Sequence, residues 1–303
     1  MQFPDFDPVL FQIGPLAIRW YALAYVAGIL LGWRYAILLS RNLALWGGRQ
    51  PTLNAAQIDD LILWVTLGVI GGGRLGYVLF YFPSMIWEAP LNIFKVWEGG
   101  MSFHGGLLGV LTAAWLWSRR HRLHFFDTMD FLAPLVPAGL GLGRLANFVN
   151  GELWGKYTGT NWGVIFPTTD PALYEQHLSQ AQLQAQYAAG ALDRYARHPS
   201  QLYEALLEGV LMFTVLWVFS MRPRHRYAVS GLFALLYGIS RFLVELVRVP
   251  DAQLGYLAFG WVTMGQLLSL PLVALGLFLL WRSRRAPVLQ PVPPAQATPA
   301  EAH

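Results

Sequence analysis

Residues 61–82 read LILWVTLGVIGGGRLGYVLFYF, a run with a single charged side chain, Arg74. A transmembrane helix needs about 20 consecutive, mostly apolar residues, so this run is long enough to cross a bilayer. Comparable runs recur along the chain, and the one that starts at Phe103 is the shortest. The sequence therefore predicts an all-α polytopic membrane protein with seven transmembrane helices, at Trp20–Leu39, Leu61–Phe82, Phe103–Ser118, Phe131–Val149, Leu202–Ser220, Val229–Val247 and Trp261–Trp281.

The composition agrees with lipid as the main solvent. Of 303 residues, 55% are hydrophobic and 13% are charged, whereas soluble proteins average about 25% charged residues. An ordinary soluble enzyme is therefore excluded. The absence of cysteine excludes a disulfide framework, a thiolate nucleophile and a cysteine-based metal site. The net charge of +4 requires no nucleic-acid partner, because membrane proteins concentrate basic residues in their cytoplasmic loops.

Basic residues are unevenly distributed between the connections. Each connection that follows an odd-numbered helix is rich in arginine, whereas the alternate connections are poorer in basic residues. The positive-inside rule assigns the arginine-rich connections to the cytoplasm. This predicts an N-terminus on the outer side of the membrane and a cytoplasmic C-terminus. The residues that set this orientation are Arg41, Arg49, Arg119, Arg120, Arg122, Arg222, Arg224, Arg226, Arg282, Arg284 and Arg285.

We expect residues 1–285 to form a single transmembrane domain with two structured connections. Residues 83–102 mix Trp, Ile and Phe with charged residues, which is typical of an arm that lies in the membrane interface. Residues 150–200 contain YEQHLSQAQLQAQYAAGALDRYARH, a run too polar to span, which predicts a helix in a small external cap. Residues 286–303, rich in Pro and Ala, are predicted to be a disordered cytoplasmic tail.

Several charged residues lie where the membrane disfavours them, at a cost of at least about 2.5–3.5 kcal/mol each on insertion scales. Arg241 and Glu245 are four residues apart, so they share a helix face and can pair. Glu204 and Glu208 have the same spacing but like charge, so a cation from another helix is expected beside them. A structural ion pair remains an alternative for each. The set comprises Arg74, Arg144, Glu204, Glu208, Arg241 and Glu245, with His104 and Asp130 at the starts of apolar runs.

Glycines are concentrated in the predicted spans. Residues 71–76 match the dinucleotide-binding pattern G-x-G-x-x-G, but a membrane span lacks the βαβ context that the pattern requires. Glycines four residues apart instead predict close packing between helices. Those beside Arg74, His104 and Arg144 could also admit a lipid headgroup to the backbone. The pairs are Gly68/Gly72, Gly72/Gly76, Gly105/Gly109 and Gly139/Gly143.

The densest polar run, residues 141–155, reads GLGRLANFVNGELWG. Arg144, Asn147 and Gly151 are three and four residues apart, so a helix would align them on one face. A guanidinium in that position suits a phosphate, because its planar fork donates two parallel hydrogen bonds. Glu152 could orient an arginine or could be a surface counterion.

At this run the chain resembles the prolipoprotein diacylglyceryl transferase family. The resemblance extends in order over most of residues 1–280, and the stretch at about 156–196 is the least similar. The blocks that carry it are FDPVLFQIGPLAIRWYALAY (6–25), GGRLGYVLFY (72–81), VWEGGMSFHGGLLG (96–109), GRLANFVNGELWG (143–155), RHPSQLYEALLEG (197–209), SGLFALLYGISRFLVELVRVPDAQ (230–253) and TMGQ (263–266).

The resemblance implies an enzyme of the bacterial inner membrane that acts on the periplasmic side. Such an enzyme transfers the diacylglyceryl group of phosphatidylglycerol to the lipobox cysteine in the signal peptide of a preprolipoprotein. A thioether forms and glycerol 1-phosphate leaves. The resemblance implies membrane lipids as further partners, and neither a cofactor, a metal nor nucleic acid.

The resemblance also assigns site residues. Arg144 and Arg241 match essential arginines, and their charge would stabilise the phosphate as it leaves. His104 matches a proposed general base for the thiol. The residues expected to bind substrate are Tyr21, Arg74, Asn147, Glu152, Gly155, Tyr237 and Glu245.

Other classes of membrane protein either remain alternatives or lack their signature residues in this sequence. A transporter or a lipid-binding protein could also hold arginines and glutamates at membrane depth. A retinal photoreceptor needs an intramembrane lysine, but Lys95 and Lys156 both fall in outer connections. A metalloprotease motif H-E-x-x-H does not occur.

Overall fold

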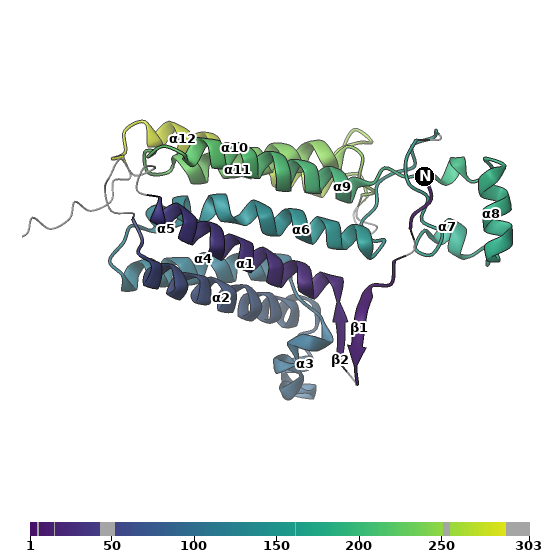
Figure 1. Ribbon diagram of the computed structural model, residues 1–303, viewed down its shortest axis with the longest axis horizontal. Helices are drawn as coiled ribbons and strands as arrows, with labels where there is room; N and C mark the ends of the chain where they lie inside the picture. Colours follow the sequence, from purple (N-terminus) through teal and green to yellow (C-terminus); the bar gives the residue numbers. More distant parts are fainter. Residues whose placement is uncertain (5, 15, 43–51, 161, 251–254, 289–303) are drawn as a thin grey trace, which may run out of the picture. The chain divides into compact units, whose positions relative to one another are not determined.

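Among the described residues, six helical stretches of the computed structural model are long and apolar enough to cross a membrane. Each coincides with a run predicted to span, so the chain is a mostly helical, multi-pass membrane protein (Figure 1). The structure describes residues 1–288 except 5, 15, 43–51, 161 and 251–254. Arg49 and most of the predicted tail lie outside these residues. The six stretches are α1 (Trp20–Arg41), α2 (Ala55–Tyr81), Phe125–Val149, Ser200–Ser220, α11 (Ala228–Glu245) and α12 (Met264–Ser283).

The third predicted span forms a helix that is less apolar than these six. α4 (Phe103–Arg120) begins at the first residue of the short run and continues to Arg119 and Arg120. It carries His104 in its first turn and these two arginines in its last turn. Length and composition therefore do not identify α4 as a span, and the prediction of seven spans is not confirmed by them.

The start of α2 is set by a polar capping interaction. The Asn54 side chain accepts a hydrogen bond from the Gln57 backbone, and the Gln57 side chain accepts one from the Asn54 backbone. This reciprocal pair satisfies two N–H groups that a helix start leaves without partners. The helix therefore begins at Ala55, ahead of the apolar run that was predicted to start at Leu61.

Two of the spans are interrupted. The stretch Phe125–Val149 consists of α5 (Phe125–Leu132), the 3₁₀ turn η3 (Ala133–Leu135) and α6 (Val136–Val149). Pro134 and Pro137 fall at this junction, and proline has no N–H to donate to a helical hydrogen bond. The stretch Ser200–Ser220 consists of α9 (Ser200–Glu204), the π-helix η5 (Ala205–Leu211) and α10 (Met212–Ser220). Single π turns inside helices occur frequently at functional sites.

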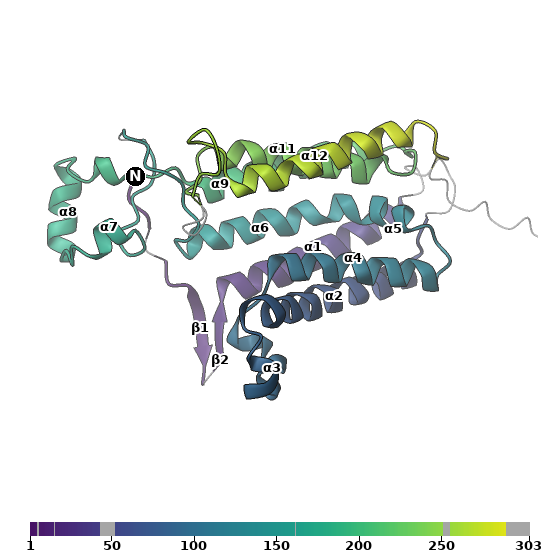
Figure 2. The same cartoon turned by 180° about the vertical axis from the view of Figure 1, so that it is seen from behind.

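The chain divides into two compact units, which are described separately. Unit 1 consists of Met1–Gly32, Pro134–Phe219 and Val229–Arg282, and unit 2 consists of Trp33–Ala133, Ser220–Ala228 and Ser283–His303. In unit 2, α2 and α4 lie side by side (Figures 1 and 2).

The contact between α2 and α4 is made by glycine backbones. A Cβ atom on Gly76 would lie 2.7 Å from the Cα of Gly105, and one on Gly72 would lie 2.7 Å from the Cα of Gly109. A Cβ on Gly68 would lie 2.6 Å from the Gly109 carbonyl oxygen. The helices are antiparallel, because rising numbers in α2 meet falling numbers in α4. The prediction of close packing at these glycines is confirmed.

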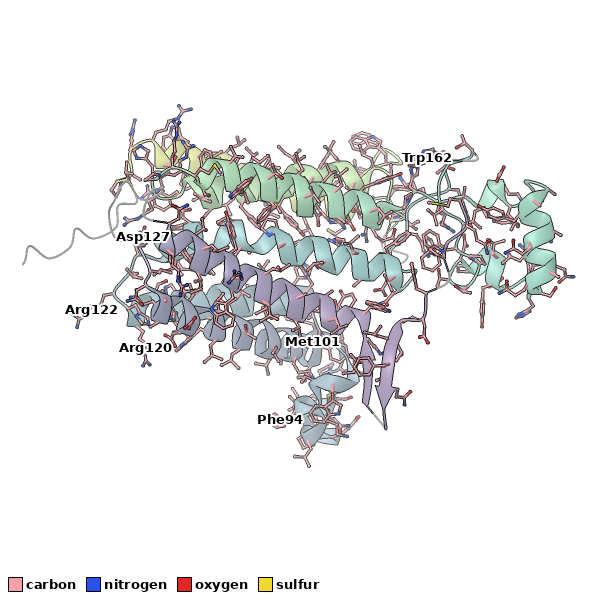
Figure 3. All side chains as sticks on the ribbon, in the orientation of Figure 1. Phe94, Met101, Arg120, Arg122, Asp127 and Trp162 are labelled. Carbon is pink, nitrogen blue, oxygen red and sulfur yellow. The ribbon has the colours of Figure 1, made fainter. Side chains whose placement is uncertain are left out.

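The predicted arm of unit 2 folds into short helices before α4. They are α3 (Met85–Glu88), η1 (Pro90–Phe94) and η2 (Val96–Glu98). Large apolar side chains are exposed here, with Phe94 at 73% and Trp97 at 70%. Figure 3 shows Phe94 and Met101 near one end of α4, and Arg120 and Arg122 at the other.

Unit 1 begins with a hairpin that the sequence reading did not predict. β1 (Val9–Ile13) pairs antiparallel with β2 (Leu16–Arg19). Gly14 at the turn has a φ of 57°, a conformation that glycine adopts without steric cost. Farther along unit 1, Gly28 of α1 approaches Gly139 of α6, whereas nothing lies within 4 Å of a Cβ built on Gly143. Only the first residue of the Gly139/Gly143 pair therefore makes a close contact.

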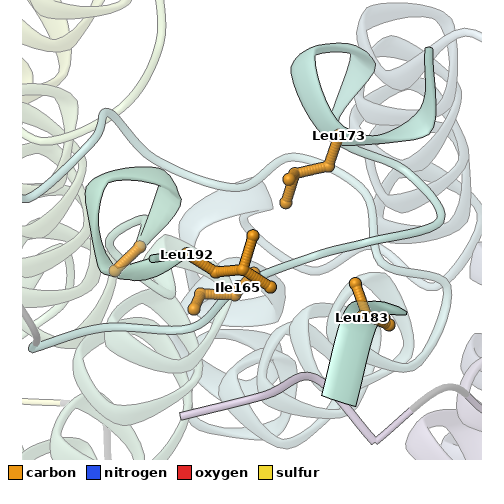
Figure 4. Packing of buried hydrophobic residues seen from close by; sticks show 5 residues of the cluster. Ile165, Leu173, Leu183 and Leu192 are labelled. Carbon is orange, nitrogen blue, oxygen red and sulfur yellow. The ribbon is translucent and has the colours of Figure 1, made fainter. Parts of the chain in front are cut away.

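The polar region of unit 1 folds around a small core of its own. It contains α7 (Pro171–Tyr174), α8 (Gln180–Ala188) and the turn η4 (Asp193–Tyr195). The helix predicted in the polar run is therefore confirmed as α8. Figure 4 shows the core, which is formed by Ile165, Leu173, Leu183, Leu192 and Ala196.

Candidate active site

Six charged side chains of unit 1 form one ion-pair network, and most of them lie in helices that are apolar enough to span a membrane. They come from three separate stretches of the chain: α6, the interrupted helix α9–η5, and α11 with the residues directly after it. These stretches are far apart in sequence, so the network exists only in the folded chain. Its members are Arg144, Glu204, Glu208, Arg241, Glu245 and Arg248.

Glu204 is the centre of the network. Its Oε1 lies 3.3 Å from Nη1 of Arg241 and 3.1 Å from Nη1 of Arg248, and its Oε2 lies 3.3 Å from Nη1 of Arg144. The Glu204 side chain is completely buried. A buried carboxylate is tolerated when cations compensate its lost hydration, and three arginines do so here.

Glu208 lies beside Arg144 because the backbones of η5 and α6 are in close contact at the neighbouring glycines. Gly209 follows Glu208, and a Cβ on it would lie 2.7 Å from the Cα of Gly141. Arg144 is three residues after Gly141 and therefore on the same face of α6. Its Nε lies 3.2 Å from Oε2 of Glu208. The expected cation between Glu204 and Glu208 is therefore confirmed as Arg144.

Glu245 divides its two oxygens between different partners. Its Oε2 lies 2.6 Å from Nη1 of Arg241, which confirms the pair predicted from their spacing, and 3.6 Å from Nε of Arg248. Its Oε1 accepts a hydrogen bond of 3.1 Å from the hydroxyl of Thr263. A Cβ on Gly265 would lie 2.6 Å from this carboxylate, so a glycine leaves room for it.

The network is asymmetric in its exposure. The side chains of Glu204 and Glu208 are fully buried, whereas those of Arg144, Arg241 and Arg248 keep 17%, 20% and 13% of their surface exposed. The carboxylates therefore fix the guanidiniums from within while part of each arginine side chain remains accessible. Such fixed cations are suited to bind an anionic group that approaches from outside the network.

The sequence marked Glu204 and Glu208 as misplaced charges but did not assign them to the site, and Arg248 falls just outside the predicted span Val229–Val247. The spacing of Arg248, three residues after Glu245, was the available signal, since residues three apart on a helix are neighbours. Leu246, Val247 and Arg248 continue the last turn of α11 through backbone bonds to Leu243 and Val244.

Two predicted substrate-binding residues, Asn147 and Glu152, bond to each other. Nδ2 of Asn147 donates to Oε1 of Glu152 at 2.8 Å, and Nδ2 of Asn150 donates to the same oxygen at 3.2 Å. The Gln201 side chain donates to the Glu152 backbone carbonyl. The structure thus pairs Glu152 with amides, and these bonds hold the end of α6 against the start of α9.

Gly155 lies where three segments of backbone meet. Its N–H donates to the His198 carbonyl at 2.8 Å, and a Cβ on it would lie 2.5 Å from the Val247 carbonyl oxygen and 2.8 Å from the Cβ of His198. Only glycine fits there. Burial and the neighbouring Lys156 ammonium lower the pKa of His198.

A pocket of about 440 Å³ opens in the polar region of unit 1 beside this segment. Arg197 lies in its wall with its guanidinium 3.7 Å from the ring centres of both Trp154 and Tyr157. Nε of Arg197 lies 2.6 Å from Oδ2 of Asp170. The pocket shares no lining residue with the ion-pair network.

The two predicted tyrosines of unit 1 lie in its transmembrane helices. Tyr237 of α11 stacks on Phe233 with ring centres 6.1 Å apart, and its hydroxyl is within electrostatic range of Arg144. Tyr21 of α1 packs against Tyr25 with ring centres 5.1 Å apart. Tyr25 is also within electrostatic range of Arg144, so aromatic side chains from two helices accompany this arginine.

Arg74 and His104 belong to unit 2. The buried Arg74 guanidinium donates to four carbonyls of the arm: those of Asn92, Ile93 at 2.9 Å, Gly99 at 2.5 Å and Gly100 at 3.2 Å. It therefore anchors the arm to α2, and its assignment to substrate binding stays a prediction.

His104 is exposed in the first turn of α4, directly after a capping serine. The Ser102 side chain accepts a hydrogen bond from the Gly105 backbone at 3.2 Å. The His104 ring packs edge-on against Phe103, with ring centres 5.6 Å apart. Because the imidazole is exposed, it does not pack in the protein interior. Its assignment as a base stays a prediction.

Comparisons with known proteins identify the family. Residues 8–282 match the family described as "Prolipoprotein diacylglyceryl transferase". Proteins named "Phosphatidylglycerol--prolipoprotein diacylglyceryl transferase" are similar over 291 residues, or 96% of either chain: 64% identical in Xanthomonas euvesicatoria pv. vesicatoria (strain 85-10), 65% in Xanthomonas campestris pv. campestris (strain B100) and 63% in Xanthomonas oryzae pv. oryzae (strain PXO99A). Family match and relatives extend over the α6, α9–η5 and α11 stretches that form the network. The chain belongs to the prolipoprotein diacylglyceryl transferase family.

Proposed function

We propose that this chain is an enzyme that transfers the diacylglyceryl group of phosphatidylglycerol to the lipobox cysteine thiol in the signal peptide of a preprolipoprotein. The cysteine sulfur attacks C3 of the diacylglyceryl group, a C–S bond forms, and the C–O bond to phosphate breaks. The leaving group is glycerol 1-phosphate, and the thiol proton passes to a base. The observation that carries the proposal is the fixing of three partly exposed arginines around the buried Glu204.

The arginines supply what this reaction needs electrostatically. When the C–O bond breaks, the phosphate gains a second negative charge. Arg144 and Arg241 are held by buried glutamates, so they need little reorganisation as that charge develops. Fixed donors in a water-poor site stabilise a developing anion more than mobile water does. We assign both to the leaving phosphate, and Tyr21, Asn147, Glu152, Gly155, Tyr237 and Glu245 to lipid binding or to the support of that site.

The thiol also needs a base. A free cysteine thiol has a pKa of about 8.5, and the ordinary pKa of histidine is near 6.5. His104 is exposed at the start of α4, and an imidazole nitrogen can accept that proton. We assign it this role, with Arg74 holding the nearby arm.

We infer seven transmembrane helices in one catalytic domain, residues 1–285. α4 packs antiparallel along the spanning helix α2 through the glycine contacts. This packing supports α4 as a further span, which brings the total to seven. The arginines at its far end support the cytoplasm on that side, and the exposed Phe94 and Trp97 support an arm in the periplasmic interface. The site then faces the periplasm from the bacterial inner membrane, beneath a cap formed by residues 150–200, with residues 286–303 as a cytoplasmic tail.

The test is transfer by the purified chain in proteoliposomes that contain phosphatidylglycerol and a lipobox peptide. Release of glycerol 1-phosphate is the readout, and a peptide with serine in place of cysteine is the blank. Arg144→Gln should lower kcat by about 10²–10³-fold, as loss of a group that stabilises a developing anion does. The matched control is Arg194→Gln, which changes an exposed arginine of the polar region and should transfer normally.

Near-normal transfer by a folded Arg144→Gln variant would refute the leaving-group assignment. No release by the unaltered chain, together with phosphate or lipid flux across the liposome membrane, would instead favour the transporter alternative.

A further inference from the structure

The three buried carboxylates of the network differ in how well they are compensated. Glu204 has three arginines within 3.3 Å. Glu245 has two arginines and the hydroxyl of Thr263. Glu208, in the described part of the chain, has one ion-pair partner, Arg144. The carboxylate with the least compensation is therefore Glu208.

The surroundings of Glu208 accentuate this difference. Its side chain is 0% exposed, and among the residues described its Oε1 has neither a hydrogen-bond nor an ion-pair partner. The corresponding oxygens of the other two, Oε2 of Glu204 and Oε2 of Glu245, also accept no hydrogen bond but each pair with an arginine. The charged and titratable groups that face it are Arg144 from α6, Glu204 from α9, and Arg241 and Tyr237 from α11. One of these, Glu204, repels a negative charge on Glu208.

Binding of a phosphodiester changes the charge balance of the network. Three arginines and three glutamates sum to zero when all are ionised, so a bound phosphodiester leaves one uncompensated negative charge. The anion also competes for the donors of Arg144, which is the cation that compensates Glu208. A buried charge without a partner is strongly disfavoured, and such a group neutralises instead.

We propose that Glu208 takes up a proton from solvent when the phosphodiester of the lipid binds to Arg144. The proton converts the Glu208 carboxylate to a neutral carboxylic acid and keeps the occupied network electrically neutral. This inference rests on the proposed function, because that function supplies the anionic lipid. It makes Glu208 a positioning residue that sets the charge of the site without touching the reacting atoms.

The direction in which lipid affinity changes with pH follows from the uptake of a proton by Glu208. Because the complex holds one proton more than the free enzyme, lipid affinity falls as pH rises, by up to about tenfold per pH unit in the range where free Glu208 is ionised. Glu208→Gln imitates the protonated group at every pH. Its affinity should be nearly independent of pH, and at basic pH it should exceed that of the unaltered protein.

The experiment is calorimetric titration of the full chain, in nanodiscs of phosphatidylcholine, with short-chain phosphatidylglycerol. Repeating the titration in buffers of different ionisation enthalpy gives the number of protons taken up. We expect about one proton per lipid for the unaltered protein and about none for Glu208→Gln. Glu175→Gln, a change at an exposed glutamate, is the matched control and should behave like the unaltered protein.

Two further ligands separate the parts of the lipid. Dimethyl phosphate carries the phosphodiester without acyl chains, and short-chain diacylglycerol carries the chains without phosphate. Proton uptake with dimethyl phosphate and none with diacylglycerol assigns the linkage to the anion. Equal uptake with diacylglycerol, or a proton count near zero for the unaltered protein, overturns the proposal.

Failure of this proposal is distinguishable from failure of the proposed function. If the preparation transfers diacylglyceryl groups but binds lipid without proton uptake, the role of Glu208 is wrong and the function stands. If it neither binds nor transfers, the function itself is wrong. A proton count near zero for the unaltered protein overturns the proposal without any variant, so the proposal stays falsifiable even if Glu208→Gln misfolds.

Discussion

At the scale of single residues, the site depends on groups that hold the arginines in place. Glu204, Glu208 and Glu245 are buried and fixed, whereas the arginines that they bind are partly exposed. Removing one partner of a buried ion pair typically costs about 3–5 kcal/mol, because the other charge is left uncompensated. Residues that fix the glutamates are therefore as important to the geometry as the glutamates themselves.

Thr263 is such a residue, and its hydroxyl should affect turnover. Thr263→Val removes the hydrogen bond that holds Oε1 of Glu245, so Oε2 is no longer directed at Arg241. We expect kcat to fall by about tenfold, corresponding to a hydrogen bond to a charged group, and KM to change less. Thr263→Ser should restore most of kcat.

A control at another helix cap distinguishes positioning of Glu245 from a purely structural role of Thr263. The Thr263 hydroxyl also accepts from the Gln266 backbone at the start of α12, so Thr263→Val removes a helix cap as well. Ser179 caps α8 in the same way. If Ser179→Ala, which should cost about 1 kcal/mol of stability, lowers kcat as much as Thr263→Val does, positioning of Glu245 is not the cause.

At the scale of helices, one glycine of α4 and one of α2 provide a matched pair of substitutions. Gly109→Ala places a methyl group 2.9 Å from the Cα of Gly72 and against the Gly68 carbonyl, so the helices must separate. Overpacking of this kind typically costs about 1–3 kcal/mol. Gly71→Ala adds the same methyl where nothing lies within 4 Å, and alanine is the better helix former by about 1 kcal/mol.

We therefore expect opposite changes in the thermal unfolding midpoint of the detergent-solubilised protein: lower for Gly109→Ala, and unchanged or higher for Gly71→Ala. Equal midpoints for both variants would mean that the glycine contact does not hold α2 and α4 together.

Most of the helices could be predicted from the sequence because the membrane imposes a local rule. About 20 apolar residues suffice to identify a span, whatever the rest of the chain does. The unpredicted features depend on other information. The hairpin at Val9–Arg19 lies in a run too short and apolar to distinguish strand from helix by periodicity, although Gly14 marked a turn. The π turn at Ala205–Leu211 has no comparable sequence pattern.

The site was predictable to the extent that its contacts are local in sequence. Arg241 and Glu245 are neighbours on one helix, so spacing alone predicted their pair. Spacing also showed that Glu204 needed a cation, but the cations come from other elements, and only the fold identifies them as Arg144, Arg241 and Arg248.

At the scale of the whole molecule, the absence of cysteine makes the orientation directly testable. Single cysteines can be introduced at Trp97, in the arm before α4, and at Arg120, the last residue of α4; both are exposed. If α4 is the seventh span, a membrane-impermeant maleimide added to intact spheroplasts should label Trp97→Cys and leave Arg120→Cys unlabelled until the membrane is permeabilised.

Labelling of both positions from the same side would place both ends of α4 on one side of the membrane and remove it from the spans. Labelling of Arg120→Cys alone would reverse the orientation that the arginines predict.

The π turn between Glu204 and Leu211 has a consequence for how lengths of related chains are compared. A π turn holds one residue more than the α-helical turn that it replaces. Because the wider turn contains the additional residue, the helices on either side of it keep the relative orientation that a continuous α-helix would give them. Deleting one residue within this stretch would therefore leave Glu204 facing Arg144, Arg241 and Arg248, whereas deleting one residue from the regular helix α10 would rotate the segments on its two sides by about 100° relative to each other. A one-residue gap between related chains is thus tolerated at the π turn and disruptive in the regular turns beside it.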